Sequence, residues 1–170
     1  GARMNQAIVV ENRIGADGAI GMEACAKAAP DGYTLCSGAS NTLNYNVVMK
    51  PDLPYSAKSF APVIHMGYFD SALMVNAAVP ARSLQELLDY SRTGAGPFTW
   101  ATFDSVGTGY LYMRWLQANR GAALLHVPYK APPQMLQAVI TGEAQGGIYA
   151  IGQLGAQLKA GKIRILAMTS

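Results

Sequence analysis

The sequence is poor in charged residues, cysteine and histidine, and it has no long apolar run. Charged side chains make up 14% of its 170 residues, whereas they make up about a quarter of an average globular domain. The most apolar stretches, such as residues 73–80, are interrupted by Asn76 and Pro80 and are far shorter than the ~18 residues of a transmembrane helix. The sequence therefore excludes a membrane-spanning helix, and its 51% hydrophobic content excludes a disordered chain.

Lysine and arginine are scattered along the chain without forming a run, although the net charge is +3. Nucleic-acid binding needs basic residues that cluster on one face, so we expect no nucleic acid among the partners. The motifs G-x-S-x-G, H-E-x-x-H and Walker A are also absent. We therefore expect a protein that is not an enzyme and that uses no metal or cofactor. An acid/base pair of Asp104 with Ser105, or of His126 with Tyr129, is the weakest alternative.

The two cysteines, Cys25 and Cys36, match no metal-binding spacing and no C-x-x-C motif. We expect two buried small hydrophobic side chains in preference to a disulfide, which stays open as the alternative. His126, at the end of a predicted strand, is expected to be a satisfied histidine of the core or its rim. Five further side chains are expected in the core: Met22, Met66, Met113, Met135 and Trp115.

Short β-rich segments alternate with segments of helical periodicity. Ser83 and Glu86 form a capping-box motif that predicts the start of one helix, and Gly161 is expected to end the last helix. We expect strands at residues 7–10, 33–36, 63–66, 72–75, 98–102, 124–127, 145–149 and 163–168. We expect helices at residues 19–28, 84–94, 108–118, 132–140 and 153–160.

The order of these elements predicts the fold class. Strands that are separated by single helices indicate right-handed βαβ crossovers and a parallel sheet, so the expected class is α/β. A change in composition near residues 76–82 indicates two lobes, which we place at residues 1–77 and 78–170.

Three loops rich in small residues follow predicted strands, at residues 15–18, 37–41 and 103–109. Ligands of open parallel sheets bind beyond the carboxyl ends of the strands, where backbone amides and the helix dipole attract anions. Any one loop could be only a tight turn, but three equivalent loops favour a site for an anion or carboxylate. Phe103 and Tyr149, at strand ends, are candidates for its apolar wall.

Several motifs carry a family resemblance. Residues 9–21, with the sequence VVENRIGADGAIG, resemble the VVENRPGAGGxIG signature of the Bug family, the extracytoplasmic solute-binding receptors of tripartite tricarboxylate transporters. Further segments resemble family motifs in the family's order, at residues 26–35, 52–55, 60–63, 79–84, 126–130 and 159–170. The resemblance thus spans the whole chain.

The resemblance implies a periplasmic binding protein of the type II class, whose two α/β lobes close on a small organic acid. It implies a mono- or dicarboxylate ligand held by loop amides, hydroxyls and water, a periplasmic location, and membrane transporter subunits as partners. The contacts on the first lobe would come from Gly15, Ala16, Asp17, Gly18, Ser40 and Asn41. Those on the second lobe would come from Phe103, Asp104, Ser105, Gly107, Thr108 and Tyr149.

The chain also departs from the family pattern. Family members are longer at both ends, so the resemblance implies an incomplete first lobe beside a nearly complete second lobe. No signal peptide is visible before residue 7, and we expect a processed or truncated N-terminus. Ile14 replaces a family proline and Asp17 replaces a glycine, and a carboxylate at residue 17 repels an anionic ligand. The alternative function is a non-transport effector-sensing or interaction module of the same fold, which would form homo-oligomers through the incomplete first lobe.

Overall fold

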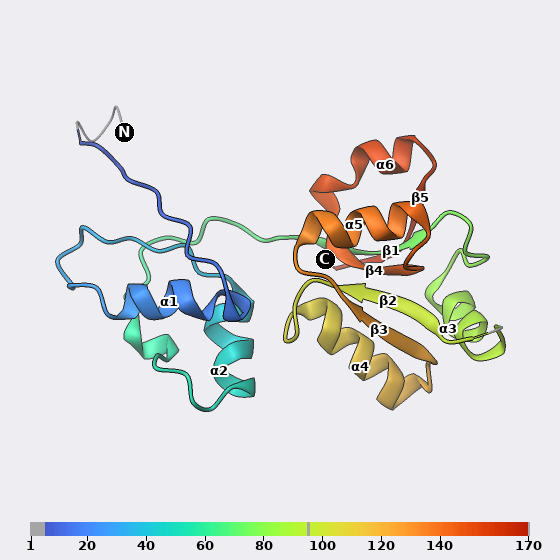
Figure 1. The fold of residues 1–170 in the computed structure, drawn as a ribbon, viewed down its shortest axis with the longest axis horizontal. Helices are drawn as coiled ribbons and strands as arrows, with labels where there is room; N and C mark the ends of the chain where they lie inside the picture. The colour runs from blue at the N-terminus through green and yellow to red at the C-terminus, as the bar shows by residue number, and fades with distance from the viewer. Residues whose placement is uncertain (1–5, 95, 170) are drawn as a thin grey trace. The chain divides into compact units, whose positions relative to one another are not determined.

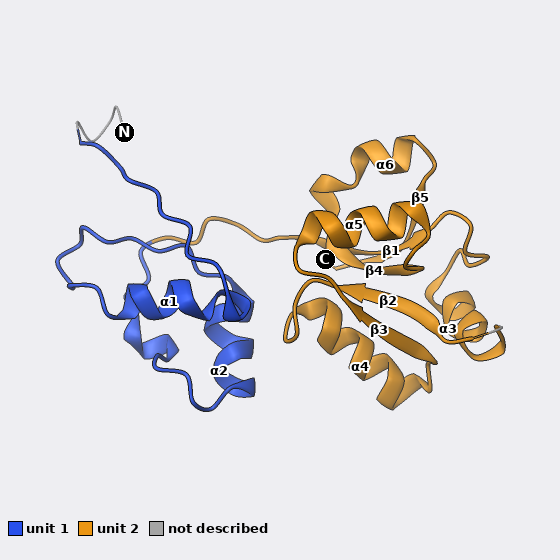
Figure 2. Cartoon of the chain, in the orientation of Figure 1, with its two compact units in different colours: residues 1–63 blue, residues 64–170 orange. Residues whose placement is uncertain are grey.

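The computed structural model describes residues 6–94 and 96–169. The chain divides into two compact units, Gly1–Val63 and Ile64–Ser170 (Figure 2), and each is described by itself. The lobe boundary expected after Ala77 falls inside the second unit, because the strand at residues 71–76 pairs with strands near the end of the chain. The extent of the two lobes stays a prediction.

The second unit is built on a five-stranded sheet with the order β3-β2-β4-β1-β5 (Figure 1). β2 runs parallel to β3 and β4, whereas β1 runs antiparallel to both β4 and β5. The α/β class is therefore confirmed, with β2 to β5 pointing in one direction. The strands are β1 Ser71–Asn76, β2 Phe98–Thr102, β3 Leu124–Pro128, β4 Gly146–Ala150 and β5 Ile163–Met168.

β1 departs from the wholly parallel sheet that the sequence predicts. The crossover rule applies to strands that pair across one intervening helix, whereas both partners of β1 lie much later in the chain. Ser71 faces Ala150 of β4, and Ala72 faces Met168 of β5. The pattern of apolar residues in a strand does not carry its direction, so the sequence gives no signal for this reversal.

Helices cover both faces of the sheet (Figure 1). Successive side chains of a strand point to opposite faces, and β1 shows this alternation. Leu73 and Val75 pack in the cluster that includes residues of α3 and α4, whereas Ala72 and Met74 pack in the cluster that includes α5. The sheet thus forms the middle of three layers. The helices are α3 Leu84–Thr93, α4 Thr108–Arg120, α5 Pro132–Thr141 and α6 Gly155–Lys159.

Two glycines let β4 pass between its neighbours. A Cβ atom at Gly146 would lie 2.5 Å from the Met74 carbonyl oxygen, and one at Gly147 would lie 2.5 Å from the Ala101 carbonyl oxygen. Both neighbours are backbone atoms of paired strands, so they cannot rotate away. Only glycine fits at the centre of this sheet.

The predicted helix boundaries of this unit rest on identifiable caps. The Ser83 hydroxyl accepts a hydrogen bond from the Glu86 amide at 3.2 Å, and α3 begins at the next residue. The Glu86 carboxylate accepts from the Arg82 amide at 2.8 Å instead of from Ser83. Gly161, with φ of 64°, follows the last helix as predicted.

The first unit consists of short helical elements around a small core in which Ala19, Met22 and Tyr55 are buried. Its longest helix, α1, precedes the loop that carries the exposed Tyr33. With so few buried side chains, this unit gains little stability from burial alone. Its elements are η1 Ala16–Gly18, α1 Ala19–Ala26, η2 Asn41–Tyr45, α2 Asn46–Met49 and η3 Ala57–Ser59.

The strands predicted at residues 7–10, 33–36 and 63–66 are wrong, because the structure assigns no strand to these segments. Their side chains are exposed, as shown by Val9 at 83% and Val63 at 77%. A β-rich pattern forms a strand only where a hydrogen-bonded neighbour is present, and these segments pair with no strand in the described part of the chain. A β-rich sequence thus indicates a preference for extended backbone, but it does not show whether a neighbouring strand is available for pairing.

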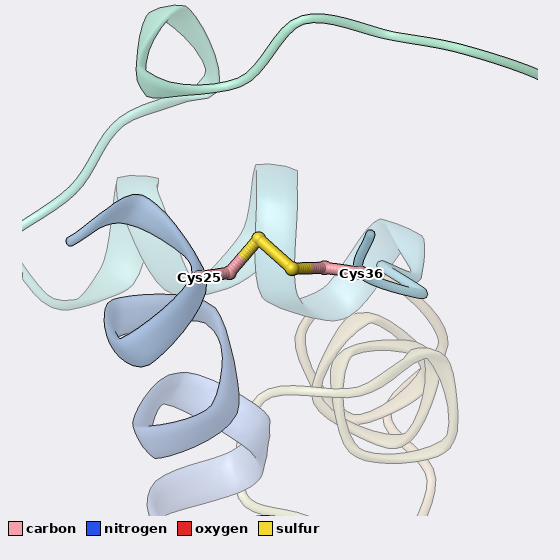
Figure 3. Close-up of a disulfide and its surroundings, with 2 residues drawn as sticks. All are labelled: Cys25 and Cys36. Carbon is pink, nitrogen blue, oxygen red and sulfur yellow. A yellow bond between two sulfur atoms is a disulfide. The ribbon is translucent and has the colours of Figure 1, made fainter. Parts of the chain in front are cut away.

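The expectation of two buried cysteine side chains is also wrong. Cys25 and Cys36 form a disulfide, with their Cα atoms 6.3 Å apart (Figure 3). Cys36 is exposed, so it does not contribute a buried side chain to the core. The turn after α1, in which Gly32 adopts φ of 82°, returns the chain so that the two residues meet.

The predicted core side chains divide into two groups. Met22, Met113 and Met135 are buried, as expected. Met66 is 74% exposed because its segment forms no strand. Trp115 is 47% exposed and stacks on Tyr112 with ring centroids 5.9 Å apart, so its place in the core is corrected to the rim of α4.

Candidate ligand-binding site

The loops of the second unit that follow parallel strands lie at one edge of the sheet. Because β2 to β5 point the same way and β1 is reversed, their carboxyl ends lie beside the amino end of β1. Residues 103–107 follow β2, residues 129–131 follow β3, and residues 151–154 follow β4. Ligands of parallel sheets bind at this edge, so it is the candidate site of this unit.

The loop at residues 103–107 leads into α4. Gly107 precedes Thr108, the first residue of the helix, and is buried. A Cβ atom at Gly107 would overlap the Asp104 carboxylate, so this carboxylate lies against the start of the helix. The first amides of a helix have no partner within it and carry partial positive charge, which suits an anionic group. Asp104, Gly107 and Thr108 therefore meet here, and Ser105 is exposed in the same loop.

A chain of hydrogen bonds fixes the beginning of this loop. The Thr102 hydroxyl donates to the Asp104 carbonyl oxygen at 2.9 Å, and His126 Nε2 lies 2.7 Å from the same hydroxyl oxygen. Because the hydroxyl hydrogen is used on the carbonyl, His126 donates through Nε2. The Tyr110 ring lies 5.0 Å from the imidazole, and burial lowers the pKa of His126. His126 is thus a satisfied histidine at the rim of the core, as predicted.

Phe103 and Tyr149 come together at the same edge. Their ring centroids are 6.4 Å apart, and the rings meet edge to face. Tyr149 is 4% exposed, and burial raises the pKa of its hydroxyl. Phe103 is 39% exposed, so it presents an apolar ring to solvent above the buried tyrosine.

A cavity of about 300 Å³ lies at this edge, beyond the carboxyl end of β4. The Ile151 amide donates to the Asp70 carbonyl oxygen at 3.0 Å, which joins the two segments that line the cavity. The sequence could not have revealed this cavity, because it depends on the pairing of β1 with β4. The lining residues are Tyr68, Phe69, Asp70, Ala150, Ile151, Gly152 and Gln153.

The first unit carries the other half of the predicted site residues. Residues 15–18 have four consecutive positive φ angles, at 123° for Gly15, 47° for Ala16, 55° for Asp17 and 84° for Gly18. This conformation is unfavourable for residues with a Cβ atom, so Ala16 and Asp17 must be held by their surroundings. The loop leads directly into α1.

Two side chains from the α2 region hold this loop. The Lys50 ammonium lies 2.7 Å from Asp17 Oδ2 and 3.4 Å from the Ala16 carbonyl oxygen. The Asn46 amide donates to the Asp17 carbonyl oxygen at 3.0 Å. Sequence reasoning missed both residues, because Lys50 is 33 positions and Asn46 is 29 positions from Asp17 and no motif links them.

The structure brings a second predicted loop of the first unit beside the first. A Cβ atom at Gly18 would lie 2.6 Å from the Thr42 methyl carbon, so residues 15–18 approach the start of η2. The Thr42 hydroxyl accepts from the Ala39 amide at 3.1 Å and donates to the Ala39 carbonyl oxygen at 2.8 Å. Ser40 and Asn41 lie between these two residues and are therefore held near residues 15–18.

Two further features, a metal-ligand cluster and a membrane-spanning helix, are absent from residues 6–94 and 96–169. No three histidine, cysteine, aspartate or glutamate side chains in these ranges are placed so that they could hold a metal ion. No helix of the described residues is long and apolar enough to cross a membrane.

Relatives of the chain are found by sequence. Residues 1–170 match the family described as the tripartite tricarboxylate transporter family receptor, TctC. The chain is 30% identical over 169 residues to the protein BugT of Bordetella pertussis, a match that covers 98% of this chain and 52% of BugT. It spans about half the length of the curated relatives it matches.

Solved structures agree with this assignment. A protein of R. palustris solved with adipate has a TM-score of 0.83 and 27% identity, over 99% of this chain and 57% of its own. MatC of Rhodopseudomonas palustris, with bound malate, has a TM-score of 0.84 and 25% identity, over 99% of this chain and 58% of its own. Because the family match covers every residue, the chain belongs to the tripartite tricarboxylate transporter receptor family, to which its Bug-like motifs point.

Proposed function

We propose that the receptor represented by this chain binds a small organic acid, a mono- or dicarboxylate, and presents it to the membrane subunits of a tripartite tricarboxylate transporter without catalysing a reaction. The observation that carries this proposal is the family match over residues 1–170. Two structural relatives support the ligand class, because adipate and malate are both dicarboxylates.

The loops described above are suited to such a ligand. On the second unit, the amides at the start of α4 and the hydroxyls of Ser105 and Thr108 can donate to a carboxylate. The exposed ring of Phe103 offers apolar surface to the carbon chain of the ligand. Asp104 has a different role in the proposal, because its own carboxylate lies against the helix start and orders the loop.

We assign the receptor to the periplasm. The disulfide between Cys25 and Cys36 supports this location, because disulfides persist in oxidising compartments such as the bacterial periplasm. A relative solved as a periplasmic transporter, 29% identical with a TM-score of 0.87, supports it as well.

Calorimetric titration of the complete receptor tests the proposed function. The ligands are a panel of mono-, di- and tricarboxylates that includes malate, adipate and citrate. We expect saturable heat for at least one mono- or dicarboxylate. A receptor that binds no mono- or dicarboxylate of the panel would contradict the proposal.

The alternative, a sensing or interaction module that acts through a partner, is favoured by one observation. Val9, Val10, Tyr33 and Leu35 are all at least 70% exposed, and exposed apolar surface of this extent often marks a protein contact. Light scattering on residues 1–170 tests the homo-oligomer that this alternative requires. A stable dimer that binds no carboxylate would support the alternative, and a monomer would exclude its homo-oligomeric form.

A further inference from the structure

The ion pair between Asp17 and Lys50 lies in the loop at residues 15–18 of the first unit, which the family resemblance assigns to the ligand. The Lys50 ammonium and Asp17 Oδ2 are 2.7 Å apart. The two side chains are 32% and 18% exposed, so solvent screens this pair less than it screens the charges of a typical surface pair. The contact joins residues 33 positions apart and thus fixes the loop to the end of α2.

The left-handed backbone conformation of Asp17 costs conformational free energy. At φ of 55°, glycine is the residue with the least strain, and Asp17 stands where the family signature has glycine. Asn46 contributes to holding the same turn. It is fully buried and donates to the Asp17 carbonyl oxygen, while its own Oδ1 has no hydrogen-bond partner within the described residues. The positive φ of Asp17 and the unsatisfied Oδ1 of Asn46 therefore occur at two residues joined by a hydrogen bond.

The charge balance of the loop follows from the pair. Lys50 is a cation next to a loop that is proposed to receive a carboxylate, and alone it would attract every anionic group of a ligand. Asp17 neutralises this cation at hydrogen-bond distance. A ligand carboxylate then meets backbone amides, and further carboxylates on the same ligand find no uncompensated ammonium in the pair.

We propose that Asp17 and Lys50 are a specificity-determining pair, in which Asp17 withholds the Lys50 ammonium from the ligand and so makes this receptor favour mono- and dicarboxylates over tricarboxylates. This inference rests on the proposed function and names the ligand class of that same site. It gives Asp17 a role in selecting the charge of the ligand.

The test compares malate with citrate as probes of the complete receptor. The variant Asp17→Asn keeps the size of the side chain, tolerates a positive φ and releases Lys50. We expect Asp17→Asn to raise the affinity for citrate relative to malate by about tenfold. Lys50→Met leaves the Asp17 carboxylate without this ammonium, so both affinities fall, that for citrate more. The double variant is expected to return close to the parent ratio.

A matched control comes from a second ion pair of the same unit. Lys27 and Glu23 lie 2.5 Å apart on α1, and neither belongs to the proposed site. Glu23→Gln and Lys27→Met should leave the ratio of citrate to malate affinity unchanged. The ratio is the decisive readout, because a purely structural role of Asp17 would change both affinities by the same factor.

The outcomes separate this inference from the proposed function. An unchanged ratio in Asp17→Asn, in a receptor that binds malate, overturns the role of the pair and leaves the proposed function standing. If the parent receptor binds no carboxylate, the proposed function fails. In that case citrate binding that appears in Asp17→Asn still supports the pair, and its absence overturns the pair as well.

Discussion

His126 shows how one side chain connects three elements. It stands on β3, donates to Thr102 on β2, and contacts Tyr110 on α4. Because Thr102 in turn donates to the Asp104 carbonyl oxygen, this histidine supports the loop at residues 103–107 without being part of it. Its protonation state therefore matters to the stability of the second unit.

We expect the stability of the second unit to depend on pH through His126. Burial lowers the pKa of His126 in the folded chain, so below about pH 6.5, the ordinary value for histidine, the unfolded chain binds this proton more readily. The contribution is complete above that pH and is lost as the pH falls toward the lower folded pKa. Urea unfolding between pH 7.5 and 5.5 measures it, and His126→Asn should flatten the dependence.

The parent and His126→Asn are compared over the same pH range. A parent whose unfolding free energy does not fall between pH 7.5 and 5.5 would contradict the assignment to His126.

Gly147 is the residue for which the sheet leaves least room. The substitution Gly147→Ala places a Cβ atom 2.5 Å from the Ala101 carbonyl oxygen and 2.6 Å from the Met135 methyl carbon. We expect a loss of about 2–3 kcal/mol in the free energy of unfolding, as for other overpacked core sites. Gly152→Ala, where no atom lies within 4 Å, is the matched control and should change it by less than about 0.5 kcal/mol.

At the scale of single residues, the sequence predicts some contacts of the candidate site and misses others. Phe103 and Tyr149, which are predicted to line an apolar wall, contact each other, because Phe103 follows β2 and Tyr149 lies near the end of the parallel strand β4. Lys50 and Asn46 could not be predicted as partners of Asp17. Their approach depends on how η2 and α2 fold back against residues 15–18, and no periodicity in the sequence encodes that contact.

Among the elements, the second unit follows the sequence and the first does not. Strands at residues 98–102 and 163–168 are predicted with their observed bounds, because buried apolar runs beside helical segments find their partners within the unit. The three wrong strands, such as residues 7–10, have the same kind of pattern but no paired neighbour among the described residues. Pairing, which is not a local property, decides between the two outcomes.

The disulfide contributes to the stability of the first unit at the level of its elements. It joins the last turn of α1 to a segment 11 positions later, in a unit with a small core. Closing a loop of this length stabilises a fold by about 2–3 kcal/mol. The double variant Cys25→Ala/Cys36→Ala is expected to lose this amount, measured by hydrogen exchange of the α1 amides.

Reduction of the disulfide provides a second test of its effect on hydrogen exchange in α1. Dithiothreitol added to the parent should accelerate exchange in α1 to the rate of the double variant, and it should leave exchange in the sheet of the second unit unchanged. An α1 helix whose exchange is insensitive to reductant would contradict the prediction.

For the molecule as a whole, the division into two units predicts where a protease cuts. Residues 61–70 have no helix or strand, and Tyr68 and Phe69 are 90% and 86% exposed. Exposed segments of irregular backbone are preferred sites of limited proteolysis. We expect chymotrypsin to cut after Tyr68 or Phe69 and to leave the sheet of the second unit intact, as identified by mass spectrometry. Early cleavage inside the sheet, for example after Tyr149, would contradict this division.

The reversed strand β1 has a consequence for the order of folding. β1 is the first strand of its sheet to be synthesised, yet it pairs with β4 and β5, the last two. The Thr169 amide donates to the Ser71 carbonyl oxygen at 2.9 Å, so even the end of the described chain is needed to complete this pairing. Contacts between such distant segments slow folding. During synthesis on the ribosome, both edges of β1 therefore stay unpaired until almost the whole second unit has been made.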